Sequence, residues 1–387
     1  MKMKAIRLLF YLLSPVAFIA TSYSQTPKPP IMGWSSWNHF HINIDEKMVR
    51  EQADAMISSR MYNAGYRFIN IDDGYFGGRD ASGKLFPNAK FPSGMKALAD
   101  YLHSKGLKAG IYTDAGMNTC GSIYDNDTLG VGVGIYGHIS LDCNLFFREW
   151  GYDFLKVDWC GGQRQMLDEE TEYTQIMNTV KSINPNIVFN VCRWQFPGEW
   201  AIKKADSWRI SGDISPTFSS ILKIIDLNVD LYKYSSAGHY NDMDMLQVGR
   251  GMSYDEDKAH FTMWCMLNSP LLAGNDLRSM SRQTVEILTN SELIALNQDA
   301  GLKQARRLLK EGNIEVWIKP LGTKGTSKAI AILNRGSSEV IYNLRPARLG
   351  ISTKSKLRDL WLHKDIGSAV TAKAVIIPRH GIVALKI

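Results

Sequence analysis

The chain has 387 residues, of which 45% are hydrophobic and 21% are charged. This composition is typical of a folded globular protein, and the length fits two domains, one of them large enough for a barrel. The formal net charge is +7. The basic residues form no block interleaved with aromatic side chains, so the sequence does not indicate a nucleic-acid-binding protein.

A short hydrophobic stretch lies near the N-terminus. Residues 8–20 are largely apolar, follow Lys2, Lys4 and Arg7, and lead into small polar residues at 21–24. The stretch is too short for a transmembrane helix, so residues 1–24 are predicted to be a signal peptide rather than a membrane anchor. Cleavage would remove three basic residues, lower the net charge to +4, and release the mature chain to the periplasm or the extracellular space.

Residues 25–300 show short apolar runs that alternate with segments of helical period. The runs predicted as strands are 31–37, 66–73, 108–114, 154–158, 187–192, 207–213, 239–245 and 269–276. The segments predicted as helices are 45–59, 95–107, 144–149, 169–183, 219–229 and 255–266. Eight strands alternating with helices predict an α/β fold, the (β/α)8 TIM barrel. An open doubly wound sheet is the alternative, but no Gly-x-Gly-x-x-Gly loop follows the first strand.

Residues 301–387 have a different pattern. Short alternating runs at 315–320, 328–334, 338–343, 357–362 and 375–385 are joined by Gly, Ser and Asn turns, without helical period. This pattern predicts a small C-terminal antiparallel β-sandwich domain. It has no cluster of carboxylates, so we expect it to stabilise the barrel rather than to carry chemistry.

Polar side chains gather at the C-terminal ends of the predicted barrel strands. They are Trp37, Asp72, Asp73, Tyr112, Asp114, Lys156, Asp158, Cys192, Arg193, Arg209, Asp213, Asp244 and Asp276. A single carboxylate in such a place can be a structural ion pair or a helix cap, as Asp72 could be for the helix that follows it. Their repetition at one end of a barrel, where barrel enzymes carry their active sites, predicts a site.

Two of these carboxylates suit the cleavage of a glycosidic bond. Lys156 and Asp158 lie on the same face of one strand, because side chains of a strand alternate, and the cation should keep Asp158 ionised as a nucleophile. Asp213 follows another strand after Ser211 and Gly212, where it could donate a proton to the leaving oxygen. Glycoside hydrolysis needs two such carboxyls, but the spacing in sequence does not decide between retention and inversion.

The cysteines and histidines do not predict a metal site, and no cofactor is expected. None of the five cysteines forms a C-x-x-C pair, and of the eight histidines only His239 stands near a strand end. Structural zinc needs several such ligands. An exported chain can nevertheless form a disulfide.

Several motifs, in order, resemble those of glycoside hydrolase family 27, the α-galactosidases and α-N-acetylgalactosaminidases. The resemblance extends from about residue 29 to the C-terminus. Its motifs are Met32-Gly33-Trp34-x-x-Trp37, Ile71-Asp72-Asp73-Gly74-Tyr75, Gly110-Ile111-Tyr112-x-Asp114, Leu155-Lys156-x-Asp158-x-Cys160, Trp208-Arg209-x-x-x-Asp213-Ile214 and Asn241-Asp242-x-Asp244-Met245.

The resemblance implies a retaining mechanism, with Asp158 as the nucleophile and Asp213 as the general acid/base. It also implies a disulfide between Cys120 and Cys160. The implied contacts to a galactose ring are Asp72 and Asp73 at O4 and O6, Trp37 near C6, Lys156 at O3 and O4, and Arg209 at O2, with Tyr112, Cys192 and Asp244 completing the pocket. The expected substrate is a terminal α-galactosyl residue of an oligosaccharide or of a polysaccharide side chain.

Arg193 departs from the family pattern. Many members have a glutamate after the pocket cysteine, directed at O2, whereas this chain has Arg193 after Cys192. An arginine donates hydrogen bonds where a glutamate accepts them, so Arg193 either turns outward or changes how C2 is recognised. The alternatives are an α-N-acetylgalactosaminidase, a β-L-arabinopyranosidase, against which the Asp72–Asp73 pair argues, and a non-catalytic sugar-binding protein, against which both carboxylates argue.

Overall fold

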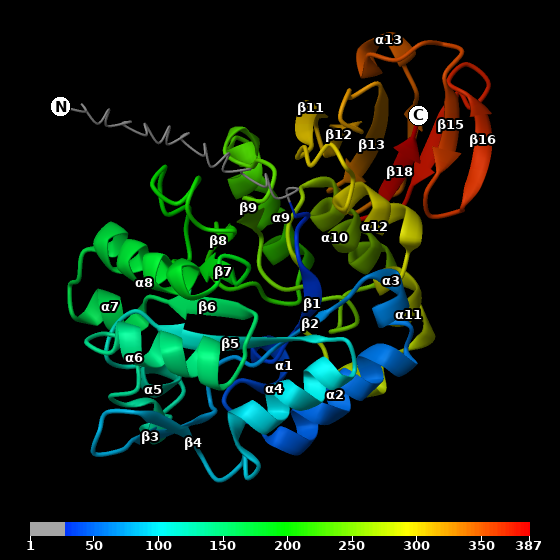
Figure 1. Ribbon diagram of the computed structural model, residues 1–387. Helices are drawn as coiled ribbons and strands as arrows, with labels where there is room; N and C mark the ends of the chain where they lie inside the picture. The colour runs from blue at the N-terminus through cyan, green and yellow to red at the C-terminus, as the bar shows by residue number, and fades with distance from the viewer. Residues whose placement is uncertain (1–27) are drawn as a thin grey trace, which may run out of the picture.

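A computed structural model describes residues 28–387, and Figure 1 shows two regions of different architecture. The predicted signal peptide, residues 1–24, lies outside the described residues. Among residues 28–387, no helix is both long and apolar enough to cross a membrane.

The first region is a barrel of eight parallel strands. They are β1 (Met32–Ser35), β2 (Phe68–Asn70), β5 (Lys108–Asp114), β6 (Phe154–Asp158), β7 (Val188–Val191), β8 (Ser207–Arg209), β9 (Tyr240–Asp242) and β10 (Leu271–Ala273). From β1 to β9 each strand pairs with the next in this order, and β10 pairs with β1. The ring closes just after β9, where Leu246 forms a parallel bridge with Ala273. All eight predicted strands are present, so the predicted barrel is confirmed.

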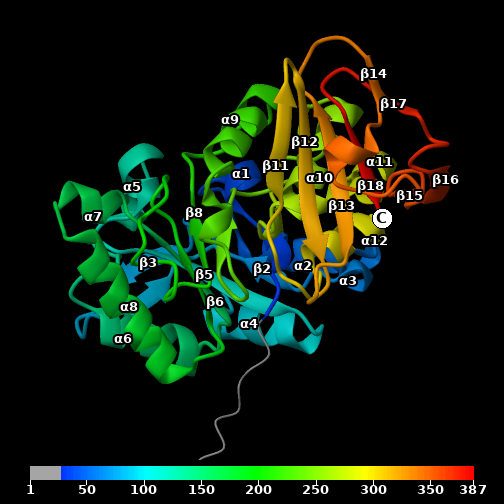
Figure 2. The same ribbon diagram turned by 90° about the horizontal axis from the view of Figure 1, so that it is seen from above.

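Helices cover the outside of the barrel (Figures 1 and 2). They are α1 (Trp37–Phe40), α2 (Glu46–Ser58), α3 (Met61–Ala64), α4 (Gly94–Ser104), α5 (Cys120–Tyr124), α6 (Ile139–Asn144), α7 (Cys160–Arg164), α8 (Glu169–Ile183), α9 (Phe218–Asn228), α10 (Tyr254–Met266), α11 (Arg282–Leu288) and α12 (Ser291–Asn297). The six predicted helices correspond to α2, α4, α6 with the π-helical turn that continues it (Leu145–Glu149), α8, α9 and α10. No helix is described between β7 and β8, where the chain makes only turns.

Side-chain caps fix where several of these helices begin. Asp45 accepts a hydrogen bond from the Met48 N–H at the start of α2. Ser253 and Glu256 form a reciprocal capping box at the start of α10. Such caps satisfy N–H groups that have no partner within the helix. They orient α2 and α10 as they leave the barrel rim.

The second region is antiparallel. Its strands are β11 (Arg306–Glu311), β12 (Ile314–Leu321), β13 (Ser327–Asn334), β14 (Val340–Asn343), β15 (Lys356–Asp359), β16 (Lys364–Ser368), β17 (Ala374–Ile377) and β18 (Ile382–Lys386), with one short helix, α13 (Pro346–Leu349). Six form one sheet in the order β11-β12-β13-β18-β15-β16, and β14 pairs with β17. The predicted antiparallel β region is confirmed.

Two details of the sequence prediction for this region are wrong. The run predicted as one strand, 375–385, is two strands, β17 and β18, because Pro378 and Gly381 form a turn between them. Strands β11 and β16 were not predicted. They lie at the edges of the sheet, where few side chains are buried, so the alternation is weak. In the barrel region, the hairpin of β3 (Phe76–Arg79) and β4 (Leu85–Pro87), on the β2–α4 connection, was not predicted either.

Strand β12 shows how the two regions pack together. Val316 and Ile318 belong to the apolar core inside the antiparallel region. Trp317, on the opposite face, belongs to the large core that also contains the buried residues of α10. The second half of α10, residues 259–266, is buried on every side, and the helix lies between the barrel and the six-stranded sheet (Figure 1).

Candidate active site

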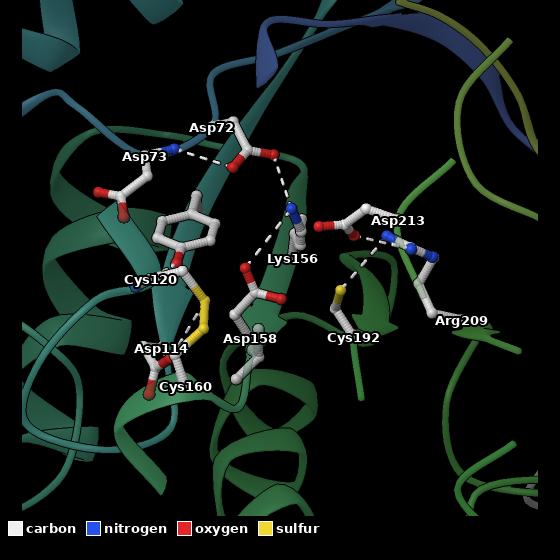
Figure 3. A network of polar contacts seen from close by, with 12 residues as sticks. Asp72, Asp73, Asp114, Cys120, Lys156, Asp158, Cys160, Cys192, Arg209 and Asp213 are labelled. Atoms are coloured by element: carbon white, nitrogen blue, oxygen red, sulfur yellow. Dashed lines mark hydrogen bonds and ion pairs between the residues drawn. A yellow bond between two sulfur atoms is a disulfide. The ribbon is translucent and has the colours of Figure 1, made fainter. Parts of the chain in front are cut away.

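Lys156 and Asp158, on β6, form the centre of the polar cluster at the barrel rim. The Lys156 Nζ lies 2.9 Å from an oxygen of Asp72, which follows β2, and 3.6 Å from an oxygen of Asp158. All three side chains are largely buried. In Figure 3 the Asp158 carboxyl lies below the Lys156 ammonium and the Asp213 carboxyl lies to its right. The carboxyls predicted to act together therefore lie at the same end of the barrel.

The charge of Asp158 is strongly influenced by its surroundings. Burial raises the pKa of Asp158 above its usual value, Lys156 and the Cys192 thiol oppose that shift, and the charges of Asp72 and Asp213 add to it. The sequence predicted that Lys156 would hold this carboxyl ionised, but the effect of burial on its pKa outweighs that of the cation. Among the described residues, the Asp158 Oδ1 has no hydrogen-bond partner.

Arg209, at the end of β8, joins two carboxylates. Its guanidinium lies 2.9 Å from Asp213 and 2.8 Å from Asp244, and it also donates to the Ser211 carbonyl. The side chains of Arg209 and Asp244 are 4% and 3% exposed, whereas that of Asp213 is 62% exposed. Asp213 is therefore the member of this group that solvent or a ligand can reach.

The ion pairs of Arg209 set the proton affinities of these two carboxyls in opposite directions. Burial opposes ionisation of Asp213, but Arg209 and Lys156 outweigh it and lower the pKa of Asp213. Burial, together with Asp213 and Asp242, raises the pKa of Asp244 to about 6 in spite of Arg209. Arg209 thus has two partners that respond differently to pH.

Two further carboxylates, Asp73 and Asp114, accept hydrogen bonds from backbone N–H groups of the loops at the rim. Asp73 accepts hydrogen bonds from the Gly74 and Gly121 N–H groups at 2.8 and 2.7 Å, and its side chain has no exposed surface. In Figure 3 it points away from Lys156. Asp114 accepts from the Gly116 and Gly161 N–H groups at 2.7 and 3.0 Å. Burial raises the pKa of each carboxyl to about 7.

The Cys120–Cys160 disulfide is present and joins the loop after β5 to the loop after β6. Tyr112, on β5, lies beneath this loop. Its hydroxyl accepts a hydrogen bond from the Cys120 N–H at 3.3 Å, and the Lys156 ammonium lies 5.3 Å from the centre of its ring. The disulfide and Tyr112 therefore both support the segment that carries Asp158.

Cys192 and Arg193 follow β7 but face different neighbours. The Cys192 Sγ lies 3.7 Å from the Arg209 guanidinium, within the cluster. Arg193 forms an ion pair with Glu169 at the start of α8. The only described group of Cys, His or carboxylate side chains close enough to share a metal ion is Asp114 with Cys120 and Cys160. The disulfide leaves that group no free thiolate to bind an ion.

Trp37 and His41 lie at the same rim, after β1. The two rings are 5.0 Å apart, and His41 is among the groups that lower the pKa of Asp213. His41 also contacts Asp125 at 3.3 Å. Trp37 was predicted from the sequence and His41 was not, because His41 follows the last residue of α1 with a non-helical backbone that residue spacing does not reveal.

The comparisons agree with this geometry. The family model described as "Alpha galactosidase A" matches residues 29–299, and the model of the "Alpha galactosidase C-terminal beta sandwich domain" matches residues 311–387. The chain is 40% identical to alpha-galactosidase A of Cellvibrio japonicus, over 97% of this chain and 96% of that protein. It is 39% identical to an alpha-galactosidase of Oryza sativa, over 91% of this chain and 83% of that protein.

A solved structure supports the same relationship. Alpha-galactosidase I from Mortierella vinacea superimposes with a TM-score of 0.84 at 30% identity, covering 92% of this chain and 96% of that one. The barrel with paired carboxylates at its rim, together with these relatives, defines a glycoside hydrolase. The chain belongs to the α-galactosidase family, glycoside hydrolase family 27.

Proposed function

We propose that this protein is a retaining exo-glycosidase that removes terminal α-D-galactosyl residues by double displacement. The observation that carries the proposal is the placement of Asp158 and Asp213. Asp158 ends β6 and Asp213 follows β8, and both carboxyls lie at one end of the barrel beside the Lys156 ammonium (Figure 3). Two carboxyls at one sugar site are what glycoside hydrolysis requires, and retention is the outcome that the family resemblance implies.

Asp158 is the proposed nucleophile. Its Oδ1 is buried and has no partner among the described residues, so this oxygen is free to attack the anomeric carbon. Lys156 stays charged beside it, because Asp158 and Asp72 outweigh the effect of burial and hold the pKa of Lys156 well above its usual value. A fixed cation at this place favours the ionised form of Asp158.

Asp213 is the proposed general acid/base. Its exposure allows it to reach a glycosidic oxygen, but Arg209 favours its ionised form, so proton donation needs this ion pair to loosen. Asp244 allows the pair to loosen, because Arg209 can keep Asp244 as its partner at 2.8 Å while Asp213 takes up a proton.

The proposed sugar contacts follow from the same cluster. Asp72 and Lys156 are placed to hydrogen-bond adjacent hydroxyls of one ring, since each side chain lies at the rim and they are 2.9 Å apart. Arg209 would bind O2, and Trp37 would pack near C6. We assign Asp73 the task of fixing the loop at Gly121, because it has no exposed oxygen with which to bind O4 or O6.

Azide rescue tests the two carboxyl assignments against each other. Asp158→Ala should abolish turnover of an aryl α-galactoside, and added azide should restore it and give the β-galactosyl azide. Asp213→Ala, the matched variant, should give the α-galactosyl azide, because there azide attacks the glycosyl-enzyme in place of water. An α-azide from the Asp158 variant would refute its role as nucleophile.

A panel of aryl glycosides then defines the sugar. We expect the α-galactoside to be hydrolysed faster than the α-N-acetylgalactosaminide and the β-L-arabinopyranoside. Arg193 does not compete for C2 in this proposal, because it is paired with Glu169. Preference for either of the other two glycosides would replace the proposed substrate while leaving the reaction class intact.

The proposal includes an exported protein with two domains. Residues 1–24 would be a signal peptide, 25–300 the catalytic barrel and 301–387 the β domain. Mass spectrometry of the mature protein should find an N-terminus at Gln25. A mature chain that retains Met1 would contradict export by signal cleavage.

A further inference from the structure

Asp244, which follows β9, has a backbone conformation that is unusual for its residue type. Its φ is 74°, in the left-handed region that glycine adopts readily and that destabilises a residue with a Cβ atom. Strain of this kind persists only where the surrounding contacts hold it, and it is concentrated at functional sites. The contacts that hold Asp244 are therefore relevant to its place in the active site.

The side chain of Asp244 joins two parts of the proposed acid/base assembly. Its Oδ2 lies 2.8 Å from the Arg209 guanidinium and accepts a hydrogen bond from the Ile214 N–H at 3.0 Å. Ile214 directly follows Asp213 in the chain, and Arg209 is also the ion-pair partner of Asp213 at 2.9 Å. Asp244 therefore fixes both the backbone that carries the proposed acid and the cation beside it.

Two hydrogen bonds of the main chain hold Asp244 in its left-handed conformation. Its N–H donates to the Asp242 Oδ1 at 2.9 Å, and its carbonyl accepts from the Trp264 indole N–H at 2.8 Å. Asp242 belongs to β9 itself, whereas Trp264 comes from α10, outside the ring of strands. The indole N–H can be removed by substitution without changing any charge.

Trp264 is placed to act as a rigid support. Its side chain has no exposed surface, and the His260 ring packs against it edge-on with the ring centres 4.0 Å apart. Burial lowers the pKa of His260 to about 3, so this ring carries no charge at neutral pH. A buried indole N–H needs an acceptor, and the Asp244 carbonyl is that acceptor.

We propose that Trp264 is a positioning residue for the general acid/base. Its indole N–H holds Asp244 in the left-handed conformation, which keeps the Asp244 carboxylate on Arg209 and on the Ile214 N–H. The inference rests on the proposed function, in which Asp213 must take up and donate a proton. Without this hydrogen bond Asp244 would relax away, and Arg209 would pair with Asp213 alone.

The charged groups around Asp213 determine the direction of the effect. Those that favour its ionised form are Arg209, Lys156 and His41. Those whose negative charge opposes its own are Asp158 and Asp244, and Asp242 acts in the same sense on Asp244. If Asp244 moves away, a negative charge is lost and the cations remain, so the pKa of Asp213 should fall. The acid would then lose its proton at a lower pH.

The test compares substrates whose leaving groups differ in their need for an acid. Trp264→Phe removes the indole N–H and keeps an aromatic ring. The glucose of melibiose needs a proton to depart, whereas dinitrophenolate departs from its α-galactoside without one. We expect Trp264→Phe to lower kcat/KM for melibiose by about 3–10-fold, the effect of one hydrogen bond. The value for the dinitrophenyl galactoside should change by less than about twofold.

The pH profile gives a second readout that a merely structural role would not move. With Trp264→Phe, the alkaline limb of kcat/KM for melibiose should shift to lower pH by about half a unit. Replacing Trp264 by benzothienylalanine keeps the shape of the ring and puts sulfur in place of the N–H. This variant should show the same selective loss and the same shift, with a melting temperature close to that of the wild type.

Trp317→Phe is the matched control. Trp317 is as deeply buried as Trp264, but its indole N–H donates to Glu315 in the β domain, at 3.1 Å. Measured on the folded fraction, this variant should leave the ratio of the two kcat/KM values and the alkaline limb unchanged. The same selective loss in Trp317→Phe would overturn the inference, because any damage to the core would then produce it.

Two further results would also overturn the inference. Equal losses on both substrates would mean that Trp264 supports the barrel as a whole, and a wild-type ratio in the benzothienylalanine variant would mean that its N–H has no part in acid catalysis. The proposed function is tested separately by Asp213→Ala, which should itself slow melibiose far more than the dinitrophenyl galactoside. If it does not, Asp213 is not the acid, and the role of Trp264 fails with that assignment.

Discussion

Buried charges occur both at the barrel rim and in the β domain, and their hydrogen bonding differs. In the β domain the carboxylate of Glu315 is fully buried, and it accepts from Arg335 at 2.7 Å, Arg307 at 3.0 Å and the Trp317 indole at 3.1 Å. At the rim, Asp158 is also buried, but one of its oxygens has no partner among the described residues. Its nearest cation, the Lys156 ammonium, is 3.6 Å away.

The comparison distinguishes a buried carboxylate that stabilises the fold from one that is available for catalysis. A buried ion stabilises a fold only when its partners replace the water that it has lost. Glu315 has such partners, so it ties β12 to its neighbours. Asp158 lacks a full set, so it costs stability and remains reactive.

The largest expected effect is that substituting Glu315 lowers stability but not activity, whereas substituting Asp158 abolishes activity but not stability. Glu315→Ala should lower the free energy of unfolding by about 2 kcal/mol, because it leaves the buried Trp317 indole N–H without its acceptor and takes from Arg307 and Arg335, both partly buried, one of their two carboxylate partners. Activity per folded molecule should persist. Asp158→Asn should eliminate activity yet leave stability within about 1 kcal/mol of the wild type, or raise it.

Denaturant unfolding, followed beside kcat measurements on the folded fraction, checks both variants. The comparison would break if Asp158→Asn destabilised the protein as much as Glu315→Ala. That result would make Lys156 and Asp158 an ordinary structural ion pair.

The second effect concerns how stability depends on pH. The dependence should have opposite signs for two aspartates that line one cavity, Asp257 and Asp276. Burial raises the pKa of Asp257 to about 7, and its Oδ1 has no partner among the described residues. Burial acts on Asp276 as well, but Arg278 and Gln52 outweigh it and lower the pKa of Asp276 to about 2.

The signs follow from the difference between the pKa of each carboxyl in the folded protein and its pKa in the unfolded chain. The contribution of Asp257 to stability is present below about pH 4 and is lost as the pH rises through 7, so Asp257→Asn should melt at a progressively higher temperature than the wild type over that range. Asp276 contributes above about pH 4 and loses its effect as the pH falls through 2. Asp276→Asn should therefore melt lower at pH 7, with a difference that shrinks in acid. Parallel melting curves for both variants would contradict these assignments.

The smallest effect should come from Arg193, which is paired with Glu169 at the edge of the site. Arg193→Met should change kcat/KM for an aryl α-galactoside by less than about threefold. Arg209→Met, the matched variant inside the cluster, should lower it by about 100-fold or more, because Asp213 and Asp244 would lose their shared cation. A change of more than tenfold in the relative rates on substrates that differ at C2, caused by Arg193→Met, would show that this arginine binds the substrate.

Much of the fold was predictable because the pattern of buried and exposed residues repeats along the barrel. Each strand ends in polar residues such as Asp72, Lys156 and Asp158, and parallel strands bring those ends together. The β domain was less predictable, since its edge strand β11 buries little and leaves a weak alternation.

The sequence by itself determined the barrel and the end of it that carries polar residues, and it proposed Asp158 and Asp213 as the paired carboxyls. The first two follow from local periodicity and strand direction. Only the tertiary structure decided that Asp73 faces a loop, that Arg193 pairs with Glu169, and that Arg209 is shared by Asp213 and Asp244. Such contacts join segments far apart in the chain or depend on a side-chain direction that residue spacing does not encode, and burial then sets the charge that each group carries.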